Sequence, residues 1–368
     1  MTRARGRRPR PKAPRGASRV GERFEAVVGP VAHGGHCVVR LEPPASRVVF
    51  VRHAIPGERV VLEITEGTDG DRFWRGVAVE VVEPSPDRVT PPCPYAGPGL
   101  CGGCDFQHVA VPAQRALKTT VVREQLARLA GLTWDGEVEA VPGDRDGLHW
   151  RTRQRYVELP DGRRAMRKHR SHEVVTVDAC LIEGVPSDHV VHGRRFEVAD
   201  DAFWQVHPGA PQVLVDTVLG MLSPQPGETA LDLYAGVGLF SAFLLDAVGP
   251  GGRVVAVEGD ATASALSVTN CPAAEVRAGD VAGVLATAYD EPFDLVVLDP
   301  PREGARRPVV EQVVARQPRA VAYVACDPAA LARDLATFAE LGYRLRELRA
   351  FDLFPMTHHV ECVALLTR

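Results

Sequence analysis

The 368-residue sequence lacks any apolar run of the length, about 20 residues, that a membrane-spanning helix needs. Its first twenty residues are rich in arginine and proline, and the apolar core of a secretory signal does not follow them. These two absences predict a soluble, cytoplasmic protein that does not contact a membrane.

Lysine is also scarce, since it accounts for three of the 43 basic residues (Lys12, Lys118 and Lys168), and the other forty are arginine. The net charge of -4 hides an asymmetry, because residues 1–20 hold eight basic residues and no acid. We expect residues 1–19 to form a disordered basic tail. Such a tail is suited to contacting nucleic-acid phosphates, or it is a solubilising segment whose arginines reflect a GC-rich coding sequence.

Disulfides are not expected in a cytosolic chain of this size, although the sequence has eight cysteines. Those that cluster are better explained by metal binding or catalysis. The eight are Cys37, Cys93, Cys101, Cys104, Cys180, Cys271, Cys326 and Cys362.

The pattern of apolar residues predicts an α/β protein with three parts after the tail. Residues 20–84 alternate apolar and polar positions between glycine and proline turns, which is typical of a small OB-like β-barrel. Residues 85–205 combine one helix with strands, including an arginine-rich hairpin that turns at Asp161-Gly162, and predict an α+β central domain. In residues 206–368 strands alternate with helices, which predicts a Rossmann-like parallel sheet covered on both faces.

Several predicted strands of the last part end in a glycine turn or an acid. Gly236 and Gly238 follow one strand, and Glu258, Asp280 and Asp299 follow the next three. Because parallel strands end at one edge of a sheet, these residues are expected to line a ligand site there, with Glu258 on ribose hydroxyls and Asp280 on the adenine amine. The arrangement favours S-adenosylmethionine over NAD, and the alternative is a set of ordinary turn residues.

A thiol, Cys326, follows the next apolar strand and is expected at the same edge. The preceding "DPPREG" turn is also typical of amino-group methylases, which need no nucleophile. A thiolate that adds to carbon 6 of uracil would activate carbon 5 for methylation, and a base must then remove the carbon 5 proton. Glu361 is the candidate base; the alternatives are a packed thiol and a surface glutamate.

Four segments, "DLYAGVG", "DPPREG", "YVACDPAALARDL" and "DLFPMTHHVECVALL", resemble the RNA 5-methyluridine methyltransferases, and the likeness covers nearly the whole chain. The resemblance implies that Cys326 is the nucleophile and Glu361 the proton acceptor. This sequence departs from the family at His207, where an asparagine is usual, and at Leu239, where a polar residue is common. The predicted cofactor-binding residues are Gln205, Tyr234, Gly236, Glu258, Asp280 and Asp299.

The spacing of four other cysteines predicts a metal site formed by two segments. Three cluster as Cys93-x7-Cys101-x2-Cys104, and Cys180 is remote. Zinc would fit four thiolates, but a three-plus-one set suits an iron–sulfur cluster better. The segments also resemble the 4Fe–4S region of the family, where the cluster supports folding and RNA binding. The N-terminal barrel resembles a TRAM domain, with Phe73, Trp74 and Arg75 as RNA-contact candidates unless the aromatic residues are core.

The sequence thus predicts a monomeric RNA (uracil-5-)-methyltransferase that uses S-adenosylmethionine and carries a 4Fe–4S cluster. A TRAM domain together with a cluster favours 23S ribosomal RNA over tRNA as the substrate. The basic hairpin side chains between Arg151 and Arg170 are expected to contact RNA or to form a solvated face. Two other hypotheses are an amino-group nucleic-acid methylase and a non-catalytic RNA-binding protein.

Overall fold

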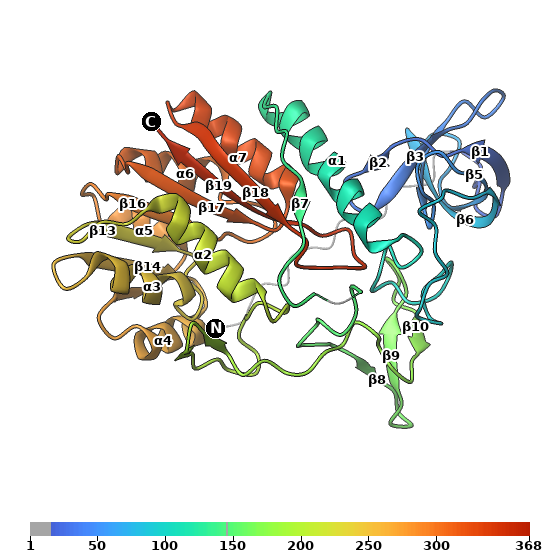
Figure 1. Cartoon of the computed structure of the whole chain (residues 1–368). Coiled ribbons are helices and arrows are strands. Elements are labelled where there is room, and N and C mark those ends of the chain that lie inside the picture. The colour runs from blue at the N-terminus through green and yellow to red at the C-terminus, as the bar shows by residue number, and fades with distance from the viewer. Residues whose placement is uncertain (1–15, 145) are drawn as a thin grey trace. The chain divides into compact units, whose positions relative to one another are not determined.

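The computed structural model describes residues 16–144 and 146–368 and divides the chain into two compact units, Met1–Arg88 and Val89–Arg368 (Figure 1). Residues 1–15, which form most of the predicted basic tail, lie outside the described residues. Within the described ranges, no helix has both the length and the apolar character needed to cross a membrane.

The first unit contains one six-stranded sheet in the order β1-β5-β6-β4-β3-β2. Alternate side chains of β5, including Val60, Leu62 and Ile64, are fully buried, as the period-2 pattern predicts. Closure of this sheet into a barrel stays a prediction. The strands are β1 (Arg23–Val27), β2 (Val31–Ala32), β3 (His36–Arg40), β4 (Val48–Arg52), β5 (Arg59–Glu66) and β6 (Phe73–Glu83).

The second unit is built on an eight-stranded sheet in the order β15-β14-β13-β16-β17-β19-β18-β7 (Figure 1). The five strands from β15 to β17 are mutually parallel, and β19 runs antiparallel to both β17 and β18. These strands are β7 (Val138–Glu139), β13 (Thr229–Leu233), β14 (Arg253–Glu258), β15 (Glu275–Ala278), β16 (Leu295–Leu298), β17 (Ala320–Ala325), β18 (Arg344–Phe351) and β19 (Glu361–Thr367).

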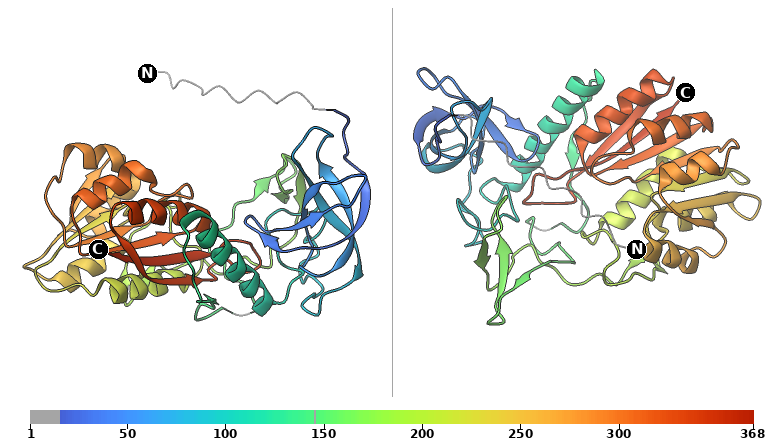
Figure 2. Two further views of the ribbon diagram at one scale, coloured as in Figure 1. Left: turned by 90° about the horizontal axis from the view of Figure 1, so that it is seen from above. Right: turned by 180° about the vertical axis from the view of Figure 1, so that it is seen from behind.

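Helices cover both faces of this sheet, as Figures 1 and 2 show. Alternate residues of the parallel strands enter two separate apolar cores, so that Val257 packs on one side and Val254 on the other. One core includes α1 (Val111–Ala130), α5 (Val281–Thr287), α6 (Arg306–Ala315) and α7 (Pro328–Glu340); the other includes α2 (Ala210–Leu222), α3 (Leu239–Val248) and α4 (Ala261–Asn270). The predicted doubly covered α/β sheet is therefore confirmed.

Two small sheets lie between α1 and α2 in the sequence. The hairpin predicted to turn at Asp161-Gly162 is confirmed, since Val157 pairs with Ala165 and Gly162 has a φ of 80°. Its first arm is much shorter than expected, because only two residues pair there. The small strands are β8 (Val157–Glu158), β9 (Arg164–Arg167), β10 (Val174–Thr176), β11 (Val190–Val191) and β12 (Arg194–Arg195). The predicted domain boundaries at residues 84 and 205 stay predictions.

Candidate active site and a cysteine-lined pocket

The candidate site lies where the parallel strands end. β13 pairs with β14 on one side and with β16 on the other, so the direction of chain progression reverses between β13 and β16. Ligands of such sheets bind in the crevice at this reversal, beyond the carboxyl ends of the strands. Tyr234, Glu258, Asp299 and Cys326 each lie at or directly after the end of one of these strands, as the sequence predicted.

The turn after β13 has a backbone that only certain residues adopt. Tyr234, Gly236 and Gly238 all have positive φ, at 64°, 56° and 91°. A side chain at Gly238 would lie 2.7 Å from the Cys271 sulfur, so this glycine allows the turn to approach α4 closely. The space beside Gly236 is open, because an added Cβ would meet nothing within 4 Å there. The turn therefore leaves backbone accessible at the sheet edge.

Glu258 connects this turn to the next helix. Its carboxylate accepts hydrogen bonds from the backbone N–H of Gly236 at 2.8 Å and from that of Asp260 at 2.7 Å. Asp280, which the sequence predicts to contact adenine, caps α5 by accepting a bond from Gly283 N–H at 3.0 Å. Gln205 is buried in the segment before α2, and the described contacts do not join it to the turn.

Three acidic side chains gather at this edge, and the described part of the chain shows no ion pair between them and a basic side chain. Burial, together with the nearby carboxylates of Asp232 and Glu258, raises the pKa of Asp299 to about 7. Burial likewise raises the pKa of Asp232 to about 6, although Ser241 donates a hydrogen bond of 2.5 Å to it. A concentration of carboxylates at a ligand edge favours a ligand that carries positive charge.

The sheet register brings Cys326 and Glu361 together. β17 ends at Ala325, which pairs with Cys362 on the antiparallel strand β19, so the next position on each strand is Cys326 and Glu361. Burial raises the pKa of Cys326 to about 12, with Glu361 and Asp299 as the next causes. Burial also holds the pKa of Glu361, which is only 3% exposed, well above its usual range.

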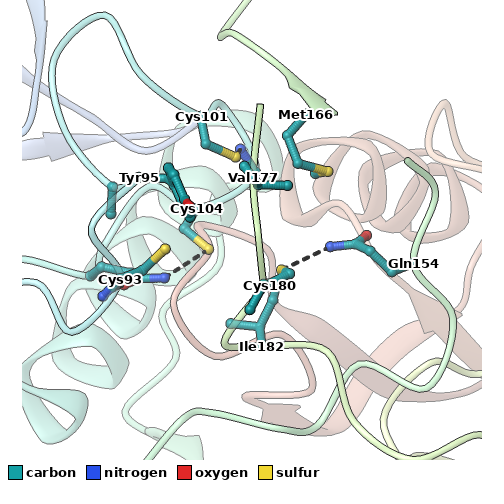
Figure 3. A pocket seen from close by; sticks show the side chains of 13 residues that line it. Cys93, Tyr95, Cys101, Cys104, Gln154, Met166, Val177, Cys180 and Ile182 are labelled. Carbon is teal, nitrogen blue, oxygen red and sulfur yellow. Dashed lines mark hydrogen bonds between the residues drawn. The ribbon is translucent and has the colours of Figure 1, made fainter. Parts of the chain in front are cut away.

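The four predicted metal-ligand cysteines line one pocket with an empty volume of about 380 Å³ (Figure 3). Tyr95 joins the two segments, because its hydroxyl donates to Asp178 at 2.8 Å and accepts from the Asp178 N–H. Among the described residues, no group of three or more histidine, cysteine or acidic side chains is arranged to hold a metal ion. The pocket-lining thiols are Cys93, Cys101, Cys104 and Cys180.

Hydrogen-bond donors face three of these sulfurs. The amides of Gln107 and Gln154 donate to Cys104 at 3.3 Å and to Cys180 at 3.1 Å, and Gly103 N–H donates to Cys101 at 3.4 Å. Burial raises the pKa of Cys104 to about 12. None of the eight cysteines, all of which lie in the described ranges, forms a disulfide. N–H donors directed at sulfur are typical surroundings of thiolate ligands.

Comparison with known proteins identifies the family. A family described as tRNA (Uracil-5-)-methyltransferase matches residues 280–368. An RNA methyltransferase of Streptomyces coelicolor is 44% identical over 430 residues, covering 95% of this chain and 93% of the relative. The chain belongs to the RNA (uracil-5-)-methyltransferase family. A 23S rRNA (uracil(1939)-C(5))-methyltransferase of a Shewanella species is 29% identical, covering 87% of this chain and 90% of that protein.

A solved structure confirms the fold expected of this family. The tRNA (uracil-54, C5)-methyltransferase of Pyrococcus abyssi, in complex with S-adenosyl-L-homocysteine, has a TM-score of 0.68 at 20% identity. The match covers 94% of this chain and all of that one. The chain therefore has a mixed α/β fold with a C-terminal methyltransferase-like domain, and the family's enzymes use S-adenosylmethionine.

Sequence reasoning missed three polar residues at the catalytic edge. Arg302 lies within the quoted "DPPREG" motif, and its positive charge opposes the increase in the pKa of both Cys326 and Glu361. Its guanidinium lies 3.2 Å from the ring nitrogen Nε2 of His359. Asp232 is fully buried within the "DLYAGVG" motif. The motifs themselves were the available signal for Arg302 and Asp232.

The two positions where the sequence departs from the family are both buried. His207 stacks on Trp150 with ring centroids 6.0 Å apart, and its Nδ1 accepts a bond from Gly209 N–H at 3.1 Å. Burial lowers the pKa of His207 to about 4, so it is neutral near pH 7. Leu239 begins α3 and packs in the apolar core. Both residues thus serve packing in this structure.

Proposed function

We propose that the chain methylates carbon 5 of a uridine in RNA through a temporary bond between Cys326 and carbon 6 of the base. The observation that carries the proposal is the placement of Cys326 beside Glu361 across strands β17 and β19, at the edge where Asp299 also lies. This edge is where ligands of such sheets bind. An amino-group methylase would need neither the thiol nor a base next to it.

Cys326 acts first in this mechanism. Its thiolate adds to carbon 6, and the electron pair of the carbon 5–carbon 6 double bond moves toward carbon 5 and the ring carbonyl. S-adenosylmethionine, when bound, supplies a methyl group on a positively charged sulfur, and carbon 5 takes that methyl as the S–CH₃ electron pair stays on sulfur. The positive charge of Arg302 favours the thiolate of Cys326, whereas the carboxylates of Glu361 and Asp299 favour the neutral thiol.

Glu361 completes the reaction. Its carboxylate takes the proton from carbon 5, the double bond forms again, and the Cys326 sulfur leaves with its electron pair. Burial already disfavours the carboxylate form of Glu361. When methyl transfer removes the donor's positive charge, an attraction that favours this carboxylate is lost, and its proton affinity rises. Glu361 therefore becomes a stronger base at the step that needs one.

We propose that the cysteine-lined pocket holds a 4Fe–4S cluster. A cluster needs a chamber with thiols around it, whereas a single zinc ion needs four sulfurs about 2.3 Å from one point. Cys93, Cys101, Cys104 and Cys180 all line one pocket, and N–H donors face three of them. Measurement of iron and acid-labile sulfide in protein purified without oxygen tests this assignment, and zinc without sulfide would overturn it.

RNA contact is supported by an exposed aromatic ring beside a half-buried arginine in the first unit and by an exposed arginine in the second. In the first unit, the guanidinium of Arg75 lies 5.3 Å from the ring of Phe73, which is 41% exposed, whereas Trp74 is buried core. Base stacking on such surfaces tolerates any sequence. In the second unit, Arg163 on the hairpin is exposed, while Arg153 bonds to the backbone carbonyl of Ala202 and has a structural role.

We propose 23S ribosomal RNA as the substrate, with tRNA as the alternative. The relative from Shewanella that acts on 23S rRNA matches over 87% of this chain, and the cysteine-lined pocket accords with an enzyme that carries a cluster. The test is to incubate the protein and labelled methyl donor with 23S rRNA and with tRNA, both transcribed without modifications. Label recovered as 5-methyluridine in 23S rRNA supports the proposal; label in an amino-methylated base, or in tRNA alone, contradicts it.

A further inference from the structure

Glu361 is held in place by the connection that precedes it. Residues 352–360 link β18 to β19 and end directly before Glu361, so the path of this loop determines where the Glu361 carboxylate lies. Met356 within the loop has a φ of 65°, a conformation that a methionine does not favour by itself. Contacts from outside the loop must therefore stabilise its shape.

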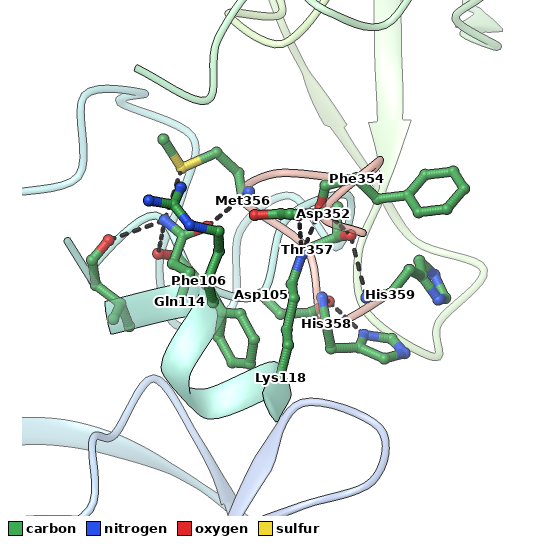
Figure 4. Close-up of polar contacts among 12 residues, drawn as sticks. Asp105, Phe106, Gln114, Lys118, Asp352, Phe354, Met356, Thr357, His358 and His359 are labelled. Atoms are coloured by element: carbon green, nitrogen blue, oxygen red, sulfur yellow. Dashed lines mark hydrogen bonds and ion pairs between the residues drawn. The ribbon is translucent and has the colours of Figure 1, made fainter. Parts of the chain in front are cut away.

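Helix α1 supplies two buried side chains that bind the loop (Figure 4). Lys118 Nζ donates to Asp352 Oδ1 at 2.5 Å and to the carbonyl of Phe354 at 3.0 Å, and Lys118 is only 1% exposed. Gln114, which is fully buried, accepts a bond from the Met356 N–H at 2.8 Å. A buried lysine and a buried glutamine are unusual on a helix, and both are used on this one loop.

The segment after Cys104 holds the loop from a second direction. The N–H groups of Asp105 and Phe106 both donate to the carbonyl of Met356, at 2.9 and 3.0 Å. Asp105 Oδ2 lies 2.5 Å from Nδ1 of His358. Gln114 joins the two sets, because its amide donates to the carbonyl of Phe106 at 3.1 Å. The polar groups of Met356 are thus bound by helix α1 and by the segment beside the cysteine-lined pocket.

We propose that Lys118 and Gln114 are positioning residues for the proton-removal step: they fix residues 352–360 so that Glu361 faces the base attached to Cys326. The inference rests on the proposed function and concerns one of its steps. It predicts a specific defect, because Cys326 follows a different strand, β17, and not the loop that leads to Glu361. Loosening the loop should impair release of the methylated base more than bond formation or methyl transfer.

The test uses the full-length protein with Lys118→Met and Asp352→Asn together, which leaves neither charge buried alone. We expect kcat to fall about 10- to 100-fold with KM for the methyl donor unchanged, because a small misplacement of a catalytic group has effects of this size. Ordinary uridine RNA should then accumulate as a denaturation-resistant adduct with the variant. Adduct formation with 5-fluorouridine RNA, which cannot lose its carbon 5 substituent, should keep its wild-type rate.

Arg316→Met is the matched control. Arg316 is also a buried cation, 3% exposed, and donates to the carbonyls of Leu285 and Ala288 at the opposite end of the sheet. The Arg316→Met variant should be less stable than wild type, but it should not accumulate the adduct with RNA. If the double variant does not fold, Gln114→Met carries the test with the same measurements.

The outcomes separate the two proposals. Wild-type protein that produces no 5-methyluridine contradicts the proposed function. Active wild-type protein, combined with a double variant whose kcat falls no further than that of Arg316→Met, or falls without adduct, overturns the positioning roles.

Discussion

Cys326 and the four pocket cysteines occupy opposite chemical surroundings within the second unit. Burial raises the pKa of both Cys326 and Cys104 to about 12. The neighbours differ: Glu361 and Asp299 raise the pKa of Cys326 and Arg302 lowers it, whereas the Gln107 amide donates a hydrogen bond to Cys104. Donors stabilise sulfur as a permanent ligand, while acids keep a thiol protonated until positive charge arrives. The comparison teaches that neighbouring groups, more than burial, distinguish the proposed nucleophile from the proposed ligands.

Removal of the nucleophile should have the largest effect. Cys326→Ala should lower turnover by about 10⁴-fold or more, since no other thiol can make the bond to carbon 6. Transfer of labelled methyl groups into 23S rRNA measures it, and calorimetry should show intact binding of the methyl donor. Cys37→Ala is the control, because Cys37 is buried in the first unit and donates to the Ala54 carbonyl. A Cys326→Ala variant with near wild-type turnover would refute the assigned role.

Glu361→Gln should have the next largest effect, because an amide cannot take a proton from carbon 5. Turnover should fall about 10²- to 10⁴-fold. Methylated RNA bound to Cys326 should accumulate and should be visible as a slower band after denaturing electrophoresis. Adding Cys326→Ala should abolish that band. Loss of turnover with no band from Glu361→Gln alone would place Glu361 elsewhere in the mechanism.

Cys104→Ser should change iron content and melting temperature, which Cys326→Ala should leave unchanged. The variant should lose iron and sulfide and melt roughly 5 °C or more below wild type, because a bound cluster joins the two cysteine segments. Cys326→Ala should keep wild-type iron content and melting temperature. Iron analysis and calorimetry check both variants. Equal iron content in Cys104→Ser and Cys326→Ala would contradict the assignment of Cys104 as a cluster ligand.

The smallest effect, measured on stability, is expected for Asp299→Asn. The pKa of Asp299 is about 7 in the folded protein and about 4 when unfolded, so the folded state binds this proton more tightly. Its contribution to stability is therefore present below pH 4 and is lost as pH rises toward 7. The variant should exceed wild type by about 4 kcal/mol in unfolding free energy at pH 8, with the gain shrinking toward pH 5. Denaturant unfolding measures this; Asp200→Asn, at an exposed site, should show no such trend.

The positions at strand ends could be predicted because the carboxyl ends of neighbouring parallel strands lie at the same edge of a sheet. Glu258, Asp299 and Cys326 each follow an apolar run, and the sheet places all three at one edge. The pairing of Cys326 with Glu361 needed the antiparallel register of β19, which resemblance implied but local sequence does not specify. The roles of Lys118 and Gln114 could not be predicted, since their partners lie more than 230 residues away in sequence. Contacts between residues so far apart in the sequence depend on how α1 packs in the folded chain.

The most direct test of the account is to locate the bond between protein and base. The protein is incubated with the methyl donor and 23S rRNA containing 5-fluorouridine, then digested and analysed by mass spectrometry. The account predicts one modified peptide, with methylated 5-fluorouridine attached to Cys326. Attachment to another cysteine, or no attachment while ordinary RNA is still converted to 5-methyluridine, would contradict it.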